Sequence, residues 1–283
     1  MTNVRPSRQS PSPHFMWAVV WFILSLIVSC GNDALMKYMG SLINPWQVAF
    51  FRCFFSVVTL LPCMLYQGRA VLVSNSPWLH VVRGGLLFLS ISLWGHGIQE
   101  ASITTATIMS FTVPIFVLLL APTVLQEQVT WPLWVATLLS FGGIFLVLQP
   151  GYKTLRSSAF FLLSAVLFGL LDVLNKKYIH RETILCMLFY STLVATFLLL
   201  GPAVYVGTFP TSCELSWLLC LGIGSNLLLY CLLRSFRLTS VSSLAPLRYL
   251  ELLLSMGVGY LFFQEIPGQG DYWGAAIIIA CTL

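Results

Sequence analysis

Two charged residues three positions apart stand inside a hydrophobic stretch in the last sixth of the chain. Arg248 and Glu251 lie within the apolar run Val241–Phe263, and a spacing of i, i+3 puts both side chains on one helix face. A charge near the middle of a membrane span costs at least about 2.5–3.5 kcal/mol on insertion scales, so it indicates function. The pair is either a clamp for a zwitterion, with Arg248 on a carboxylate and Glu251 on a cation, or a self-neutralising ion pair.

Two further carboxylates lie closer to the ends of their hydrophobic runs. Asp33 is followed four residues later by Lys37, and Asp172 is followed at the same spacing by Lys176. A helical i, i+4 ion pair with a lysine reaching to the interface explains each pair structurally. Because the pairs occupy matched positions in the two halves of the chain, a coupling or gating role is the functional alternative.

Aromatic and amide side chains share helix faces with polar groups. Trp94 follows Ser90 by one turn, and Tyr230 follows Asn226. Such rings pack or mark the membrane interface in most helices, but here a planar purine could stack between them and accept hydrogen bonds. The candidate substrate-binding residues are Arg248, Glu251, Trp94, Asn226, Tyr230, Trp21 and Ser110, and the candidate coupling or gating residues are Asp33, Asp172, Lys37 and Lys176.

The composition indicates that lipid surrounds the elements that carry these residues. The chain has 283 residues, of which 58% are apolar and 8% are charged, against about 45–50% and about 25% in soluble domains. A membrane helix needs roughly 20 apolar residues. We predict an all-α membrane protein in which a polar tail, residues 1–14, precedes ten spans: Phe15–Met39, Pro45–Tyr66, Leu79–Gly97, Ala101–Leu125, Val129–Gln149, Ser158–Tyr178, Ile184–Val206, Leu215–Leu233, Val241–Phe263 and Tyr272–Leu283. The tenth run is short, and we expect it to be a truncated helix.

The distribution of positive charge predicts the orientation. Basic residues gather in alternate loops and at the N-terminus, and fewer lie on the other side. The richer side carries Arg5, Arg8, Arg69, Lys176, Lys177, Arg181, Arg234 and Arg237, and the poorer side carries Lys37, Lys153 and Arg156. The N-terminus is therefore expected in the cytoplasm. Arg83 near a helix start is expected to be an interfacial anchor, while Arg52 admits an anchoring or a functional interpretation.

An internal repeat divides the chain into residues 15–149 and 158–283. A shift of about 139 residues aligns Trp21, Ser25, Ser29, Asp33 and Lys37 with Phe160, Ser164, Phe168, Asp172 and Lys176. Leu125-Gln126-Glu127 likewise matches Phe263-Gln264-Glu265. Since five helices are an odd number, the second half starts from the opposite side of the membrane. Two inverted five-helix repeats are a framework for alternating access, with the substrate held between them.

The chain resembles the EamA-type members of the drug/metabolite transporter superfamily. The resemblance rests on diffuse motifs: Pro45 before Phe51-Arg52, Arg83, the run Ala101–Ala106 with Pro114, Gln126-Glu127 and Gly142-Gly143. It implies a central cavity lined mainly by helices one, three, four, six, eight and nine. A narrower likeness, to S-adenosylmethionine uptake carriers of intracellular bacteria, rests on the segment from Ala245 through Glu251 to Pro267.

These observations predict a secondary transporter in the bacterial inner membrane. The resemblance implies an adenosyl-type metabolite, with S-adenosylmethionine uptake or its exchange for S-adenosylhomocysteine, and the charged pair indicates a zwitterionic metabolite. Uptake or efflux of amino acids, drugs or other small metabolites is the alternative within transport. A lipid-modifying membrane enzyme is a remote alternative, because the sequence has no HExxH, GxSxG or clustered histidines. Scattered basic residues and a net charge of +5 do not indicate nucleic acid. We expect no cofactor and no metal, and the oligomeric state is left open.

Overall fold

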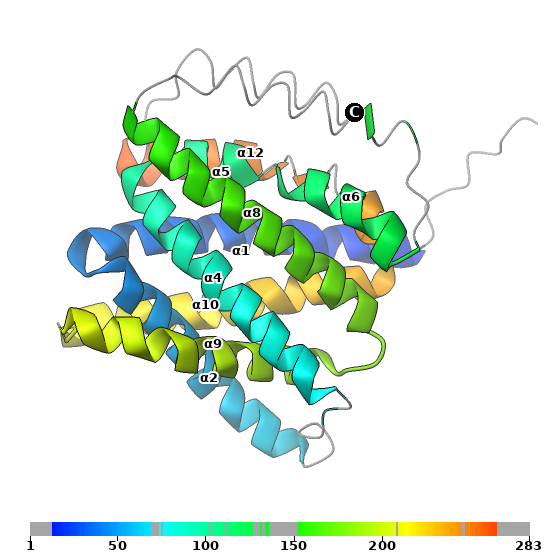
Figure 1. Ribbon diagram of the computed structural model, residues 1–283, viewed down its shortest axis with the longest axis horizontal. Helices are drawn as coiled ribbons and strands as arrows, with labels where there is room; N and C mark the ends of the chain where they lie inside the picture. The colour runs from blue at the N-terminus through cyan, green and yellow to red at the C-terminus, as the bar shows by residue number, and fades with distance from the viewer. Residues whose placement is uncertain are drawn as a thin grey trace, which may run out of the picture.

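Every regular element in the described part of the chain is a helix (Figure 1). The computed structural model describes residues 13–68, 74, 76–101, 103–110, 112–126, 131, 134–135, 152–207, 209–244, 247–248 and 250–264. The helices are α1 (Pro13–Leu42), α2 (Pro45–Gln67), α4 (Pro77–Glu100), α5 (Ile103–Ser110), α6 (Val113–Val124), α8 (Tyr152–Tyr178), α9 (Ile184–Val206), α10 (Ser212–Leu238), α11 (Val241–Leu244) and α12 (Leu250–Phe263). Most of the predicted polar tail, most of the span Val129–Gln149 and all of Tyr272–Leu283 lie outside the described residues.

Six of the described helices are long and apolar enough to cross a bilayer. They are α1, α2, α4, α8, α9 and α10, and α6 and α12 are shorter apolar helices. Large apolar side chains on their outer surfaces are exposed, among them Phe197 and Val204, each 68% exposed. Such surfaces are stable against hydrocarbon, so the protein is an integral membrane protein.

Local sequence signals set where these helices begin and end. Asn44 accepts a hydrogen bond from the backbone N–H of Trp46, and Pro45 opens α2 where its missing N–H is not needed. Thr211 and Glu214 form a reciprocal capping box at the start of α10. Gly207 ends α9 in the left-handed conformation, with φ 74°. The polar connections between spans therefore fix the helix boundaries.

The helix pairings follow a two-fold pattern. α1 packs along α10, and α4 packs along α8; α1 also packs on α12, and α6 on α8. If the two predicted halves are exchanged, the pairing of α1 with α10 becomes that of α8 with α4, and the pairing of α1 with α12 becomes that of α8 with α6. The contact of α2 with α9 joins equivalent helices of the two halves. This pattern follows the internal repeat of the sequence.

Two predicted spans are discontinuous in the structure. Instead of one helix over Ala101–Leu125, α5 ends at Ser110 and α6 begins at Val113, with Pro114 in the first turn of α6. The region of Val241–Phe263 is likewise divided into α11 and α12. Pro114 has no backbone N–H and cannot continue the hydrogen-bond ladder of α5, but in the first turn of α6 that donor is not needed, which explains a new helix start at Val113. Broken backbone at membrane depth is tolerated where it lines a cavity.

The close packing of α10 on α2 depends on Gly222. A Cβ on Gly222 would lie 2.7 Å from Phe55 Cβ and 2.9 Å from the backbone N of Ser56. We expect Gly222→Ala to lower the stability by about 1–3 kcal/mol, because the overlap involves backbone. Thermal unfolding in detergent measures the change. Gly31→Ala is the matched control, since a Cβ on Gly31 would have no neighbour within 4 Å; equal melting temperatures for the two variants would contradict the prediction.

Candidate functional site

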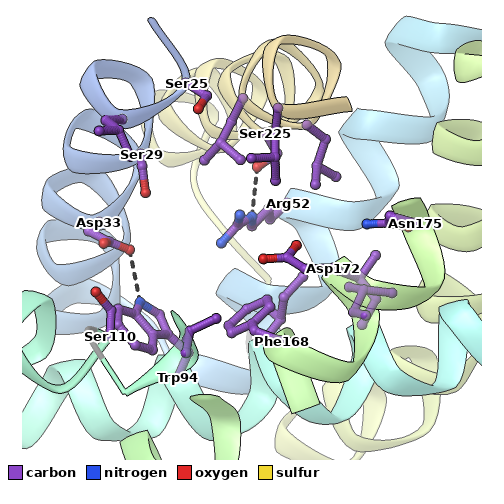
Figure 2. A pocket seen from close by; sticks show the side chains of 18 of the residues that line it. Ser25, Ser29, Asp33, Arg52, Trp94, Ser110, Phe168, Asp172, Asn175 and Ser225 are labelled. Atoms are coloured by element: carbon purple, nitrogen blue, oxygen red, sulfur yellow. Dashed lines mark hydrogen bonds between the residues drawn. The ribbon is translucent and has the colours of Figure 1, made fainter. Parts of the chain in front are cut away.

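A central cavity lies between the two halves of the chain (Figure 2). Side chains from α1, α2, α4, α8, α9 and α10 and from both discontinuous helices line it. The empty space along this lining, including the part open to solvent, is about 1100 Å³. Its polar and aromatic lining residues are Ser25, Ser29, Asp33, Arg52, Ser56, Trp94, Ser110, Phe168, Asp172, Asn175, Thr192, Ser225, Arg248 and Glu251. The set of helices implied by the resemblance omitted the second and seventh, which contribute Arg52 and Thr192.

The cavity carries more negative than positive formal charge. Its described lining holds three carboxylates, Asp33, Asp172 and Glu251, and two guanidinium groups, Arg52 and Arg248. With all five ionised, the lining has one negative charge in excess. Apolar walls strengthen the interaction of such charges with a ligand, because the effective dielectric is lower than in water.

Arg248 forms an ion pair with Asp172. Its Nη2 lies 3.4 Å from Asp172 Oδ2, and both side chains are largely buried. No ion pair between Arg248 and Glu251 occurs in the part of the chain that the structure describes. The guanidinium therefore crosses to α8 to form its ion pair, and it acts on Glu251 only from a longer distance.

The ion pair separates the central cavity from a smaller one. The smaller cavity is lined by Phe22, Pro114, Val117, Asp172, Phe236, Val241, Leu244 and Arg248. Within the described residues, Asp172 and Arg248 are the two that both linings share. A solute moving between the two cavities would therefore pass this ion pair.

Arg52 points into the cavity and binds neutral partners. Its Nε donates to Ser225 Oγ at 2.6 Å, and Nη1 lies 3.5 Å from Met36 Sδ (Figure 2). No carboxylate of the described residues is within ion-pair distance of this guanidinium. Arg52 is thus a cavity cation that is available for an anionic ligand group.

Asp33 faces the same space from α1. Its Oδ1 accepts a hydrogen bond of 2.8 Å from Trp94 Nε1. The Trp94 ring packs edge-on near Phe168, with centroids 6.3 Å apart, and both rings line the cavity. One wall of the cavity therefore consists of the Trp94 and Phe168 rings, with the Asp33 carboxylate hydrogen-bonded to Trp94. An aromatic ring system of a ligand can pack on this wall.

Several predicted binding residues lie outside the described cavity lining. Trp21 and Tyr230 contact each other edge-on, with centroids 6.0 Å apart. Asn226 joins α10 to α2, because its Nδ2 donates to Ser56 O and to Thr59 Oγ1, each at 2.9 Å. Trp94, Ser110, Arg248 and Glu251 do line the cavity, as do Asp33 and Asp172.

The two predicted gating lysines bind backbone carbonyls at helix ends. Lys37 Nζ donates to Ala101 O at 2.9 Å, just after α4. Lys176 Nζ donates to Phe236 O and Thr239 O, each at 2.7 Å, at the end of α10. Cations favour helix C-termini. Lys37 therefore links α1 to the connection between α4 and α5, and Lys176 links α8 to the connection between α10 and α11.

Sequence reasoning left Arg52 undecided and omitted Phe168 and Asn175 from the candidates. The sequence does contain a signal for Arg52. A charged arginine two turns into an apolar helix has a free-energy cost of membrane insertion, as Arg248 has, and this cost indicates function. Phe168 stands one turn before Asp172 in the repeated row. Periodicity places such residues on a face but does not show which faces meet.

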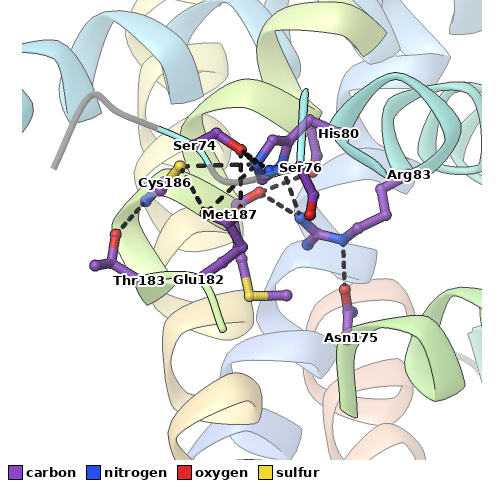
Figure 3. A network of polar contacts seen from close by, with 10 residues as sticks. Ser74, Ser76, His80, Arg83, Asn175, Glu182, Thr183, Cys186 and Met187 are labelled. Atoms are coloured by element: carbon purple, nitrogen blue, oxygen red, sulfur yellow. Dashed lines mark hydrogen bonds and ion pairs between the residues drawn. The ribbon is translucent and has the colours of Figure 1, made fainter. Parts of the chain in front are cut away.

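A second polar cluster lies beside the cavity, at the start of α4 and α9 (Figure 3). His80 Nε2 is 2.9 Å from Ser74 Oγ, which donates to Glu182 Oε1 at 3.1 Å. Cys186 Sγ lies 3.6 Å from Glu182 Oε2. Arg83, which we expected at the interface, is buried and reaches the cavity residue Asn175, because its Nε donates to Asn175 Oδ1 at 2.8 Å.

This cluster is a hydrogen-bond network and not a favourable cation site. The ligand atoms of His80, Glu182 and Cys186 lie within 4.8 Å of one another, and metal ions accept such donors. A cation on His80 Nε2 leaves the ring proton on Nδ1. There it would face Arg83 Nη1, 3.5 Å away. The His80 Nδ1–H and an N–H of Arg83 would then be two donors facing each other, and the bound cation and the guanidinium would repel each other. The cluster is therefore better explained as a structural network.

Discontinuous helices around a charged central cavity, in a repeated helical membrane fold, define a secondary transporter. The chain belongs to the EamA-like transporter family, whose sequence model matches residues 16–149 and 155–283. It is a transporter and not an enzyme.

Known proteins similar to this chain are also transporters. The S-adenosylmethionine uptake transporter of Rickettsia prowazekii is 40% identical over 270 residues, which cover 95% of this chain and 92% of that protein. The protein of the same name from Rickettsia conorii is 39% identical with the same coverage. A riboflavin transporter of Rhizobium johnstonii is 28% identical over 84% of this chain and 79% of that protein. A solved crystal structure shares the fold, with a TM-score of 0.75 at 15% identity over 94% of each chain.

Proposed function

We propose that this protein takes up S-adenosylmethionine across a bacterial inner membrane by alternating access, in net uptake or in exchange for S-adenosylhomocysteine. The proposal places the substrate in the central cavity between the two halves. ATP is not the direct energy source, since the sequence contains no Walker motif. The names of the Rickettsia relatives support the choice of substrate.

The charge of the cavity carries the proposal. S-adenosylmethionine has a carboxylate, an ammonium and a sulfonium, and therefore a net charge of +1. The cavity lining has one carboxylate more than it has guanidinium groups. After Arg248 and Asp172 are paired, one cation and two carboxylates remain, which is the inverse of the ligand. Opposite charges in a low-dielectric site favour binding.

We assign the substrate carboxylate to Arg52. The sequence assigned it to Arg248, but the Asp172 carboxylate already occupies that guanidinium at 3.4 Å. Arg52 keeps donors facing the cavity and has neutral partners, Ser225 and Met36. The adenine ring is assigned to the wall made by Trp94 and Phe168, where aromatic packing adds affinity.

The membrane architecture in this proposal is two inverted repeats of five helices, with the N-terminus in the cytoplasm. The exchange-symmetric helix pairings support it. So does Gln126 with φ 57° at the end of α6, which recurs as Gln264 with φ 53° at the end of α12. Lys37 and Lys176 also bind equivalent junctions in the two halves.

The orientation has a direct test. A reporter that is active only in the cytoplasm is fused after Gln67, after His180 or after Ser41. We expect signal from the first two fusions and none from the third, because basic residues concentrate on the first side. The reverse pattern would contradict the cytoplasmic N-terminus and with it the orientation of both repeats.

Uptake by whole cells tests the substrate. A bacterial host without its own uptake of S-adenosylmethionine expresses the protein and is given the labelled compound. We expect accumulation that excess S-adenosylhomocysteine reduces and excess riboflavin leaves unchanged. Competition by riboflavin or by simple amino acids, with none by S-adenosylhomocysteine, would indicate that the protein transports a different metabolite. That result would contradict the proposal.

A further inference from the structure

The unpaired charges of the cavity lie in a fixed order along α1. Arg52 contacts Met36, one turn beyond Asp33, through its Nη1. Glu251 lies against the preceding turn, because its backbone carbonyl accepts from Cys30 Sγ at 3.7 Å and its carboxylate accepts a hydrogen bond from Ser29. Asp33 stands between them and interacts electrostatically with both. Six residues of helix separate Cys30 from Met36, or about 9 Å at 1.5 Å per residue. The order is a cation, a carboxylate and a second carboxylate.

The charged end of S-adenosylmethionine has the complementary order. Its carboxylate and ammonium share one carbon, and the sulfonium follows two methylene groups further along. Placing the carboxylate on Arg52 puts the ammonium beside Asp33 and the sulfonium beside Glu251. We propose that Glu251 binds the sulfonium and is the residue by which the protein distinguishes S-adenosylmethionine from S-adenosylhomocysteine. This inference rests on the proposed function.

The internal repeat does not account for a carboxylate at Glu251. Its matched position in the first half is Val113, which also lines the cavity. The Glu251 side chain is buried and accepts a hydrogen bond from Ser29, and it forms no ion pair within 4.0 Å among the described residues. Burying an ionised carboxylate is costly unless a cation balances it. Arg248 acts on Glu251 only from beyond ion-pair distance, because its guanidinium pairs with Asp172. A ligand cation could therefore be a closer partner for the Glu251 carboxylate.

The chemistry of a sulfonium suits this carboxylate. A sulfonium carries charge but no N–H, so it is recognised through electrostatics and contact and not through donated hydrogen bonds. An ammonium has three donors and fits Asp33. Trp94 Nε1 donates to Oδ1 of Asp33 at 2.8 Å, and Oδ2 accepts no hydrogen bond among the described residues. S-adenosylhomocysteine has the ammonium but a neutral thioether. It should therefore make use of Asp33 and gain little from Glu251.

Two isosteric variants separate these roles. Equilibrium binding of both ligands is measured on purified wild type, Glu251→Gln and Asp33→Asn. We expect Glu251→Gln to lower the affinity for S-adenosylmethionine at least about tenfold. The affinity for S-adenosylhomocysteine should change by less than about threefold. Asp33→Asn should weaken both ligands by a similar factor, and its amide oxygen can still accept from Trp94. Arg248 keeps its partner Asp172 in both variants, so neither variant leaves that guanidinium unpaired.

The outcomes distinguish the inference from the function on which it rests. If folded wild type binds neither ligand, the proposed function fails. If wild type binds S-adenosylmethionine but Glu251→Gln weakens both ligands equally, or Asp33→Asn alone changes their ratio, the assignment of Glu251 is overturned.

A ligand series on the wild-type protein covers the case in which Glu251→Gln does not fold. An analogue with a protonated amine in place of the sulfonium keeps the charge, and one with a neutral carbon in its place removes it. We expect the charged analogue to bind at least about tenfold more tightly than the neutral one. Equal affinities would show that the cavity does not sense this charge, and the inference would fail.

Discussion

Arg52→Gln is expected to lower the affinity for S-adenosylmethionine about a hundredfold while the protein still folds. Removing one partner of a buried, hydrogen-bonded charge pair costs ~2–5 kcal/mol, and each 1.4 kcal/mol is tenfold in affinity. The side chain donates to Ser225 and pairs with no carboxylate in the described residues, so its removal breaks no internal ion pair. Equilibrium binding and the yield of folded protein are measured together.

An exposed arginine provides the control for this variant. Arg156 pairs with Glu100 at 3.8 Å on the surface, where its side chain is 68% exposed. Arg156→Gln should leave affinity and yield unchanged, since exposed ion pairs contribute little. If Arg52→Gln binds S-adenosylmethionine within threefold of wild type, the carboxylate does not lie on Arg52.

The second large effect is expected at the Arg248–Asp172 ion pair. Arg248→Met alone strands the largely buried Asp172, and breaking a buried pair in this way costs about 3–5 kcal/mol. Replacing both residues, Arg248→Met with Asp172→Leu, removes both charges and should restore most of the stability. Thermal unfolding in detergent compares the single variant, the double variant and wild type.

Ligand binding by the double variant then decides between two assignments. Arg52, Asp33 and Glu251 remain in it, so we expect binding of S-adenosylmethionine within about threefold of wild type. Transport should change instead, because a solute moving between the two cavities would pass this ion pair. A folded double variant that no longer binds S-adenosylmethionine would show that Arg248 takes the carboxylate, as the sequence-based clamp assumed.

Much of the helical framework followed from hydrophobic patterning. The hydrophobic run Ile184–Val206 has the bounds of α9, which Thr183 caps at its start and Gly207 ends. Hydropathy does not indicate the discontinuities, because it does not change across Phe111 and Thr112 and therefore predicts one span over Ala101–Leu125. Pro114 was the available signal, since proline begins helices more readily than it continues them.

The candidate site was less predictable than the helices, for a geometric reason. A four-residue step shows that Asn226 and Tyr230 share a face of α10, but that face meets Thr59 on α2 and Trp21 on α1. Arg83 was expected at the interface because of its place near a helix start. It is buried because residues from distant segments, such as Asn175, close over it. Which faces meet depends on tertiary packing that a single sequence does not contain.

Counterflow in liposomes containing the purified protein tests the central claim most directly. The liposomes are loaded with unlabelled S-adenosylmethionine, and labelled S-adenosylmethionine is added outside. The account predicts transient accumulation of label with the wild-type protein, and none in protein-free liposomes or with Arg52→Gln. Folded wild-type protein that accumulates no label, or equal accumulation by Arg52→Gln, would contradict it.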